Sequence, residues 1–184
     1  MKEYKSYQEY LNHQSSKLKN HFSEVSQKNN EIRDIVYKRY NDFSSWRGQT
    51  VLCLGARLGG EVEAFKKMGA VAVGIDIAPG ENNNHVLYGD FHDVKFPDRC
   101  FDFVFSNCID HVYDIDKYLK NIFRLLKSDG VGLLEVGVQK AGEYETMDTQ
   151  DITELKRQIN KYFKIKFTKP IDNGWKAELL ILKK

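Results

Sequence analysis

From residue 49 onward, short apolar runs alternate with segments of helical periodicity. The spacing predicts strands over residues 51–55, 71–77, 85–89, 101–107 and 131–137, and helices over about 60–68, 115–127 and 150–161. Gly69 is a natural stop for the first helix, and Asp114 can cap the second. Strands that alternate with helices form a parallel sheet covered on both faces, and right-handed crossovers make it doubly wound.

The carboxyl-terminal stretch has a different pattern. Two strand-like runs, FKIKFTKPI (163–171) and WKAELLILKK (175–184), are separated only by Asp172-Asn173-Gly174. Asn-Gly between two such runs is typical of a hairpin. We therefore expect an α/β fold whose sheet is mostly parallel and has an antiparallel strand at its end. Ser128-Asp129-Gly130 is expected to be a turn before the strand at 131–137.

Residues 1–47 are polar and contain no proline. Apolar residues recur there at spacings of three and four, which predicts amphipathic helices, broken near Asn29-Asn30. Such helices can be a layer packed on the core, a lid over a substrate pocket, or both. We expect one domain over 1–184, with a helical cap or lid at 1–47 and a cofactor-binding core at 48–184.

Charge and cysteine content narrow the classes of protein. The chain has 184 residues and a formal charge of +2, which argues against a broad nucleic-acid-binding surface. Its three cysteines show no disulfide or metal-binding spacing, which is typical of reduced thiols, so we expect a cytoplasmic protein. No apolar run approaches the ~20 residues of a membrane span, and we expect no membrane association. The oligomeric state is left open.

The turn after the first expected strand favours a nucleotide-like ligand. In VLCLGARLGG (51–60), Gly55, Gly59 and Gly60 allow close approach of a ligand to the backbone. Asp76 follows Gly55 by 21 residues, at the end of the second strand. An acid at this spacing accepts hydrogen bonds from ribose hydroxyls. Asp76 can instead cap a turn before Pro79.

Two further polar groups follow the third and fourth strands, where ligands collect in open α/β sheets. GDFHD (89–93) offers an Asp for an adenine amine, with Phe91 near the ring face. SNCIDHVYD (106–114) brings Ser106, Asn107, Asp110 and His111 together.

These segments, together with LLKSDGVGLLEV, resemble the successive motifs of class I S-adenosylmethionine-dependent methyltransferases, in particular the small type-11 group. The resemblance covers residues 50–137, and the closing hairpin fits the Rossmann-like, seven-stranded sheet of that family. It implies the cofactor S-adenosylmethionine and the product S-adenosylhomocysteine. Asp76 would bind the ribose, Asp90 and Phe91 the adenine, while Ser106 and Asn107 would flank the sulfonium. The cofactor-binding residues that it implies are Gly55, Ala56, Arg57, Gly59, Asp76, Ile77, Gly89, Asp90, Phe91, Ser106 and Asn107.

Two positions depart from the family pattern. Members usually have an acid at position 53 and a glycine at 57, where this chain has Cys53 and Arg57. The missing acid removes a contact to the cofactor's amino group. Arg57 either anchors the cofactor's carboxylate as a charge-assisted donor or blocks the cleft. We favour the anchor.

Methyl transfer to an oxygen acceptor needs a base. His111 is the candidate, with Asp110 orienting it or acting itself. We expect a small hydroxylated acceptor, such as a glycan sugar, that stacks on Tyr4, Tyr7, Tyr10 or Trp46 if the helical segment is a lid. Asp90, His92, Asp93, Asp110 and His111 form no tight ligand motif, so we expect no required metal.

Two alternatives stay open at this point. An NAD-dependent oxidoreductase could use Asp76 for its ribose, although Arg57 replaces the middle glycine of that fingerprint. A catalytically inactive cofactor-binding module of the same fold is the other.

Overall fold

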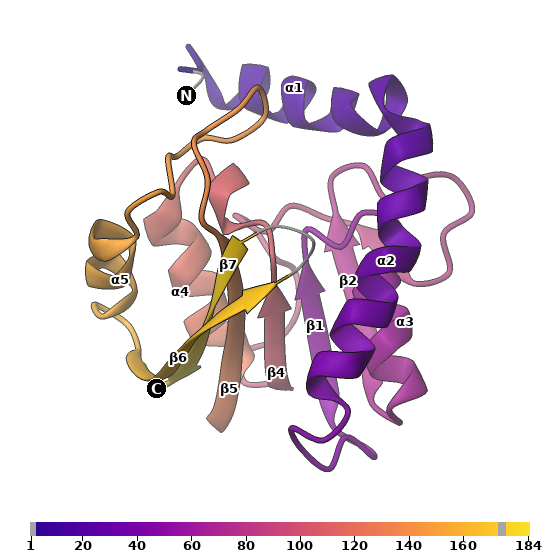
Figure 1. Cartoon of the computed structure of the whole chain (residues 1–184), viewed down its shortest axis with the longest axis vertical. Helices are drawn as coiled ribbons and strands as arrows, with labels where there is room; N and C mark the ends of the chain where they lie inside the picture. The colour runs from indigo at the N-terminus through magenta and orange to yellow at the C-terminus, as the bar shows by residue number, and fades with distance from the viewer. Residues whose placement is uncertain (1–2, 173–175) are drawn as a thin grey trace.

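A seven-stranded sheet forms the centre of the molecule in the computed structural model, which describes residues 3–172 and 176–184 (Figure 1). The strand order is β3-β2-β1-β4-β5-β7-β6, in which β1 to β5 run parallel and β7 runs antiparallel to both β5 and β6. The expected fold class is thereby confirmed. The strands are β1 (Thr50–Leu54), β2 (Val71–Asp76), β3 (Val86–Tyr88), β4 (Phe101–Ser106), β5 (Leu126–Gly137), β6 (Lys164–Asp172) and β7 (Lys176–Lys183).

Helices cover both faces of the sheet and its carboxyl edge. The α-helices are α1 (Tyr7–Asn20), α2 (Phe22–Tyr40), α3 (Gly60–Lys67), α4 (Ile115–Leu125) and α5 (Thr153–Ile159), and a short 3₁₀ helix, η1 (Ile109–His111), follows β4. In Figure 1, α2 and α3 lie on one side of the sheet and α4 and α5 on the other, while α1 crosses above the strand ends. No helix within the described ranges is long and apolar enough to cross a bilayer.

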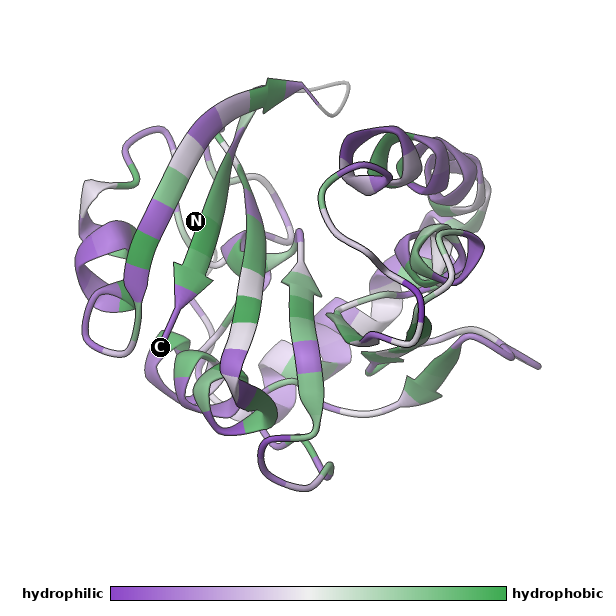
Figure 2. Cartoon of the chain, turned by 90° about the horizontal axis from the view of Figure 1, so that it is seen from below, coloured by the Kyte–Doolittle hydropathy of each residue, from purple (hydrophilic) through white to green (hydrophobic). Residues whose placement is uncertain are grey.

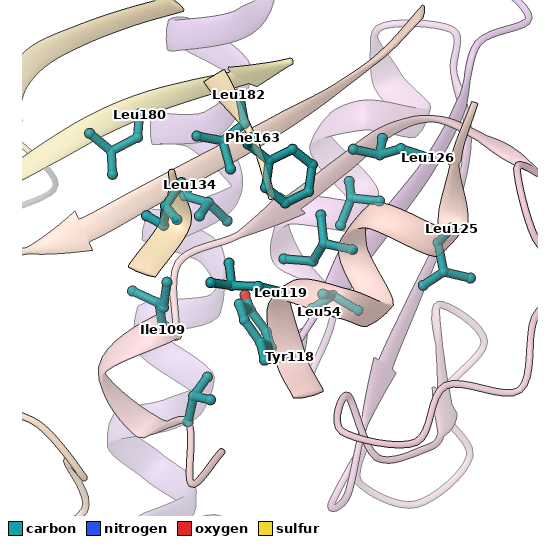
Figure 3. Packing of buried hydrophobic residues seen from close by; sticks show 14 of the residues in the cluster. Leu54, Ile109, Tyr118, Leu119, Leu125, Leu126, Leu134, Phe163, Leu180 and Leu182 are labelled. Atoms are coloured by element: carbon teal, nitrogen blue, oxygen red, sulfur yellow. The ribbon is translucent and has the colours of Figure 1, made fainter. Parts of the chain in front are cut away.

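The two faces of the sheet bury two separate apolar clusters. In β1, Leu52 and Leu54 pack with the residues of α4 and α5, whereas Val51 and Cys53 pack with those of α2 and α3. This alternation follows from the two-residue period of a strand. Figure 3 shows the first cluster, in which side chains of β5, β7 and α4 converge, and Figure 2 shows the hydrophobic residues gathered on the strands. Cys53 is fully buried, as expected of a small core residue.

The break in the N-terminal helices lies at His21 and not at Asn29-Asn30, so that prediction is wrong. His21 ends α1 and precedes α2 with φ −130° and ψ 33°, outside the helical region. Asn29 stays helical because α2 packs along α3, where the Gly60 N–H donates to Asn29 Oδ1 at 2.7 Å. A tertiary contact thus overrides the low helix propensity of asparagine.

Two smaller features of the chain also differ from expectation. Ser128-Asp129-Gly130 lies within β5 rather than in a turn before it, since Leu126 already pairs with Phe101 and Val131 with Phe103. The six residues 126–131 of β5 thus oppose the three residues 101–103 of β4, so the pairing is irregular here in the manner of a bulge. The Asn173-Gly174 part of the expected hairpin turn lies outside the described residues, but β6 and β7 pair antiparallel on either side of it.

Candidate active site

A cavity of about 690 Å³ lies at the carboxyl edge of the sheet. Its wall combines the turn at 55–58, residues 107–111 around η1, and the loop after β5 with residues from the end of α1 and the first half of α2. Cavities of this size commonly hold small molecules. The wall therefore joins the expected cofactor turn to the expected catalytic residues.

Three positions of the turn have room only for glycine, and at Gly60 a Cβ would lie 2.2 Å from the Asn29 carbonyl oxygen. A Cβ on Gly55 would lie 2.3 Å from Cys108 Sγ, and one on Gly59 would lie 2.8 Å from His85 Cβ. Both glycines have positive φ, at 70° and 91°. Arg57 also has a positive φ, 43°, in a conformation that costs a non-glycine residue about 1–2 kcal/mol. A glycine at position 57 would not bear that cost. The arginine side chain is thus present although its backbone conformation is unfavourable.

Asp76 is buried behind this turn and holds its shape. Its Oδ2 accepts from the Arg57 backbone N–H at 3.1 Å, and its Oδ1 accepts from the Ala78 N–H at 2.7 Å. Each carboxylate oxygen keeps further acceptor capacity. The two expected roles, turn cap and ribose acceptor, are thus compatible. Asp76 does not line the cavity, and neither does its neighbour Ile77.

The expected adenine end is closed by α1. The Tyr7 hydroxyl donates to Asp90, and the His92 N–H donates to Asp90 Oδ1 at 2.8 Å. Burial raises the pKa of Asp90, but the hydrogen bonds from His92 and Tyr7 outweigh it and lower that pKa overall. Phe91 packs edge-on against Tyr118 at 5.3 Å, and the Gly89 N–H donates to the Asp76 carbonyl at 2.9 Å. Asp90 therefore faces α1 and Phe91 packs against α4, and neither residue lines the cavity.

The aromatic residues of the N-terminal segment do not face the cavity. Tyr4, Tyr7 and Tyr10 pack on one another and around Tyr113, with ring centroids 5.3–6.3 Å apart. Trp46 belongs to the core, where it is 2% exposed and donates to the Tyr40 carbonyl at 2.6 Å. The expectation that these rings stack on an acceptor is not met by this arrangement.

Of the residues at the end of β4 and after it, Ser106 has a structural role, whereas the next two line the cavity. Ser106 is 1% exposed, and its hydroxyl donates to the Leu54 carbonyl at 3.4 Å, so it ties β4 to β1. Asn107 and Cys108 line the cavity. Burial raises the pKa of the Cys108 thiol to about 12, which leaves it un-ionised at neutral pH. Asn107 is thus the polar side chain of this pair that a ligand can meet.

His111 has one defined tautomer. Its Nδ1 lies 3.0 Å from the Tyr144 carbonyl oxygen, which can only accept, so Nδ1 carries the proton and Nε2 has a free lone pair. Nε2 lies 4.0 Å from Asp110 Oδ1 and 3.9 Å from Glu145 Oε1. Burial lowers the pKa of His111, so the ring is neutral near pH 7. A neutral imidazole facing a cavity is suited to take up a proton.

Asp110 is held rigidly beside this ring. Its Oδ2 accepts from Gln139 Nε2 at 3.0 Å, and its carbonyl accepts from the Thr146 N–H at 2.7 Å. These bonds fix the loop after β5 against η1. A ring nitrogen of His111 and carboxylate oxygens of Asp110 and Glu145 lie within 4.8 Å of one another. The two carboxylates can therefore stabilise a positive charge on the ring.

Sequence reasoning missed several charged residues of the cavity wall, among them Lys17 from α1, Glu61 from α3 and Glu145 from the loop after β5. Lys17 and Glu145 carry no motif, because only the tertiary fold brings them to the cavity. Glu61 had a signal, since an acid directly after the glycine turn lies at a helix N-terminus. It is 4% exposed, and burial raises its pKa to about 8.

Comparison with known proteins gives a consistent result. The family described as "Methyltransferase domain" matches residues 52–134. Phosphoethanolamine N-methyltransferase 2 of Caenorhabditis elegans is 31% identical over 123 residues, which are 59% of this chain and 28% of that enzyme. The chain therefore spans just over a quarter of the length of this relative.

Solved structures share the fold at low identity. The 1,6-didemethyltoxoflavin-N1-methyltransferase of Burkholderia thailandensis, with its substrate and S-adenosylhomocysteine bound, matches with a TM-score of 0.75 at 16% identity, covering 100% of this chain and 92% of that one. A phosphoethanolamine N-methyltransferase 2 of Haemonchus contortus, bound to phosphomonomethylethanolamine and S-adenosylhomocysteine, matches at 0.60 and 23%, covering 76% and 38%.

Proposed function

We propose that the protein is a class I, S-adenosylmethionine-dependent methyltransferase whose domain includes residues 52–134, and that it methylates a small polar acceptor in the cavity beside His111. The observation that carries this proposal is the neutral, fixed tautomer of His111 at the wall that also holds the glycine turn. The antiparallel β7 and the match to the methyltransferase domain favour this function over the NAD-dependent alternative.

The residues present fit the cofactor's amino-acid end. Gly55 and Ala56 line the cavity, and Arg57 and Glu61 bring one cationic and one acidic side chain to the same wall. When bound, the cofactor supplies an electrophilic methyl carbon on its sulfonium. Asp76 is proposed for the ribose and Asp90 for the adenine, which requires the Tyr7 hydroxyl to leave Asp90.

The protein's part in the reaction is to orient the acceptor and to take its proton. Holding the two reactants in line can supply ~7–11 kcal/mol of the barrier. His111 Nε2 accepts the acceptor's proton, and Asp110 and Glu145 stabilise the imidazolium that forms. Asn107 lies on the same wall and can hold the acceptor by hydrogen bonds.

The acceptor expected from the sequence is a hydroxyl of a small molecule or glycan. A second candidate is a small amine, because Asp110 and Glu145 place two carboxylates beside His111, the proposed base. These carboxylates would attract an ammonium group. Two similar enzymes act on nitrogen by their names. The absence of a nucleic-acid partner and of a required metal, and the cytoplasmic location, stay predictions.

The first test is calorimetric titration with S-adenosylhomocysteine and with NAD. Binding of the former, lost in Asp76→Ala, supports the proposal, whereas binding of NAD alone contradicts it. No binding of either would favour a module whose cleft Arg57 blocks.

The second test is methyl transfer to a panel of amines and sugars, with and without a chelator. His111→Gln should lower kcat by about 10²–10⁴-fold while S-adenosylhomocysteine still binds. His85→Gln, a partly exposed histidine that pairs with Glu63, is the control. Unchanged turnover in His111→Gln would show that the base is another residue.

A further inference from the structure

Glu61 is a buried carboxylate without a cationic partner. It lies in the first turn of α3, is 4% exposed and lines the cavity beside Gly55, Ala56 and Arg57. No Lys, Arg or His within residues 3–172 and 176–184 lies at ion-pair distance from it, and its hydrogen bond comes from its own backbone N–H. A buried carboxylate in this state is costly unless a ligand compensates it.

The other carboxylates nearby are compensated. Asp110 accepts from Gln139, and Glu145 lies beside His111 and accepts from the Gly142 N–H at 2.9 Å. Glu63, two residues along the same helix, lies 3.7 Å from Arg33 and 3.9 Å from His85. A negative charge near the amino end of α3 interacts favourably with the helix dipole, but a surface residue such as Glu63 is sufficient for that role. Burial of Glu61 at the cavity therefore calls for another reason.

Glu61 lies on the helix that packs against the position where an acid is missing, because Cys53 shares its apolar cluster with Val62 and Phe65 of α3. Burial, and to a smaller extent Glu61, raise the pKa of the Cys53 thiol far above its usual value. Cys53 is fully buried in β1 and stays neutral. Glu61 is thus the acidic residue of the β1–α3 unit that lines the cavity.

We propose that Glu61 binds the α-ammonium group of the cofactor's amino-acid end and so replaces the acid absent at position 53. Arg57, on the same wall, then receives the α-carboxylate, and the pair recognises the two opposite charges of one amino acid. This inference rests on the proposed function, because it takes S-adenosylmethionine as the ligand. It assigns a binding role to a residue that the sequence pattern does not mark.

The test measures binding by the full chain to S-adenosylhomocysteine and to its deaminated analogue, in which hydrogen replaces the amino group. The wild type should prefer S-adenosylhomocysteine by about 10- to 100-fold, the range of a hydrogen bond to a charged group. Glu61→Gln should lose that preference while its affinity for the analogue stays unchanged. Glu63→Gln, on the same helix, is the matched control and should behave as the wild type does.

A second measurement separates binding from a structural role. Titration at pH 7 in buffers of different ionisation enthalpy should show that the wild type releases more protons with S-adenosylhomocysteine than with the analogue, because Glu61 ionises against the ammonium group. Glu61→Gln should lack this difference. Equal losses for both ligands, or a retained preference, would overturn the inference while leaving the proposed function standing. Failure of the wild type to bind S-adenosylhomocysteine at all would overturn both.

Discussion

The two N-terminal helices are attached to the molecule in different ways. Helix α2 is part of the core: Val36 and Tyr40 are fully buried, and Arg39 Nη1 donates to the buried Glu135 of β5 at 2.6 Å. The Tyr40 hydroxyl donates to the same carboxylate at 2.8 Å. Helix α1 buries Tyr10 and Gln14 and lies over loops rather than strands.

Besides the aromatic packing of Tyr7 and Tyr10 on Tyr113, the contacts of α1 are mostly polar and reach loops rather than the sheet. Gln14 Nε2 donates to the Tyr144 carbonyl at 2.6 Å, the His13 ring stacks on Tyr144 at 4.6 Å, and Tyr7 donates to Asp90. Segments held by few apolar contacts open at low free-energy cost. The sequence predicted one helical cap over residues 1–47. The structure leads us to expect that α1 alone can serve as a lid, while α2 is structural.

The largest expected effect is the loss of stability when a buried side chain of α2 is removed. Tyr40→Ala should lower the free energy of unfolding by about 3–5 kcal/mol, as for other large buried side chains. Urea denaturation measures it. Phe22→Ala, at the 60%-exposed first residue of the same helix, should change stability by less than about 0.5 kcal/mol. A similar small effect of Tyr40→Ala would mean that α2 is not part of the core.

A smaller effect is expected when α1 loses its buried amide. Gln14→Ala should lower stability by about 1 kcal/mol and speed hydrogen exchange of α1 amides, with α2 amides unchanged. The Tyr144 carbonyl keeps its bond from His111 Nδ1, which limits the loss. Gln8→Ala removes an exposed side chain that bonds Asn12 within α1 and serves as control. Equal acceleration in both helices would show that they open as one unit.

Tyr7→Phe tests whether α1 competes with the cofactor. It removes the hydroxyl that donates to Asp90 and keeps the ring. If the adenine needs Asp90, the variant should bind S-adenosylhomocysteine about fivefold more tightly, the equivalent of about 1 kcal/mol for one hydrogen bond. Calorimetry measures the change. Weaker binding would place the Tyr7 hydroxyl in the bound site instead.

The smallest effect is a pH dependence. Because hydrogen bonds lower the folded-state pKa of Asp90 in spite of its burial, its stabilising contribution is full above the unfolded pKa of ~3.9. That contribution is lost as the pH falls through the lowered folded value. The stability difference between wild type and Tyr7→Phe should therefore be larger at pH 6 than at pH 3. A difference that grows on acidification would show that Asp90 is protonated in its bond with Tyr7.

Local signals were sufficient for most of the fold. The apolar runs predicted the first four parallel strands within a residue or two and the end of β5, although β5 begins five residues before the predicted start at 131. Asp114 caps α4 through the Lys117 N–H as expected. Predictions failed where contacts between distant segments decide the outcome: α2 continues through Asn29 because α3 packs against it, and Trp46 is core because Phe65 and Phe103 surround it.

The sequence by itself determined the sheet, the glycine turn and the position of Asp76, because each depends on a short-range property: strand period, positive φ, or the end of a strand. Only the tertiary structure decided which charges meet at the cavity. Lys17, Glu61 and Glu145 come from three distant segments, and their burial, which no local pattern encodes, sets how strongly each interacts with a ligand.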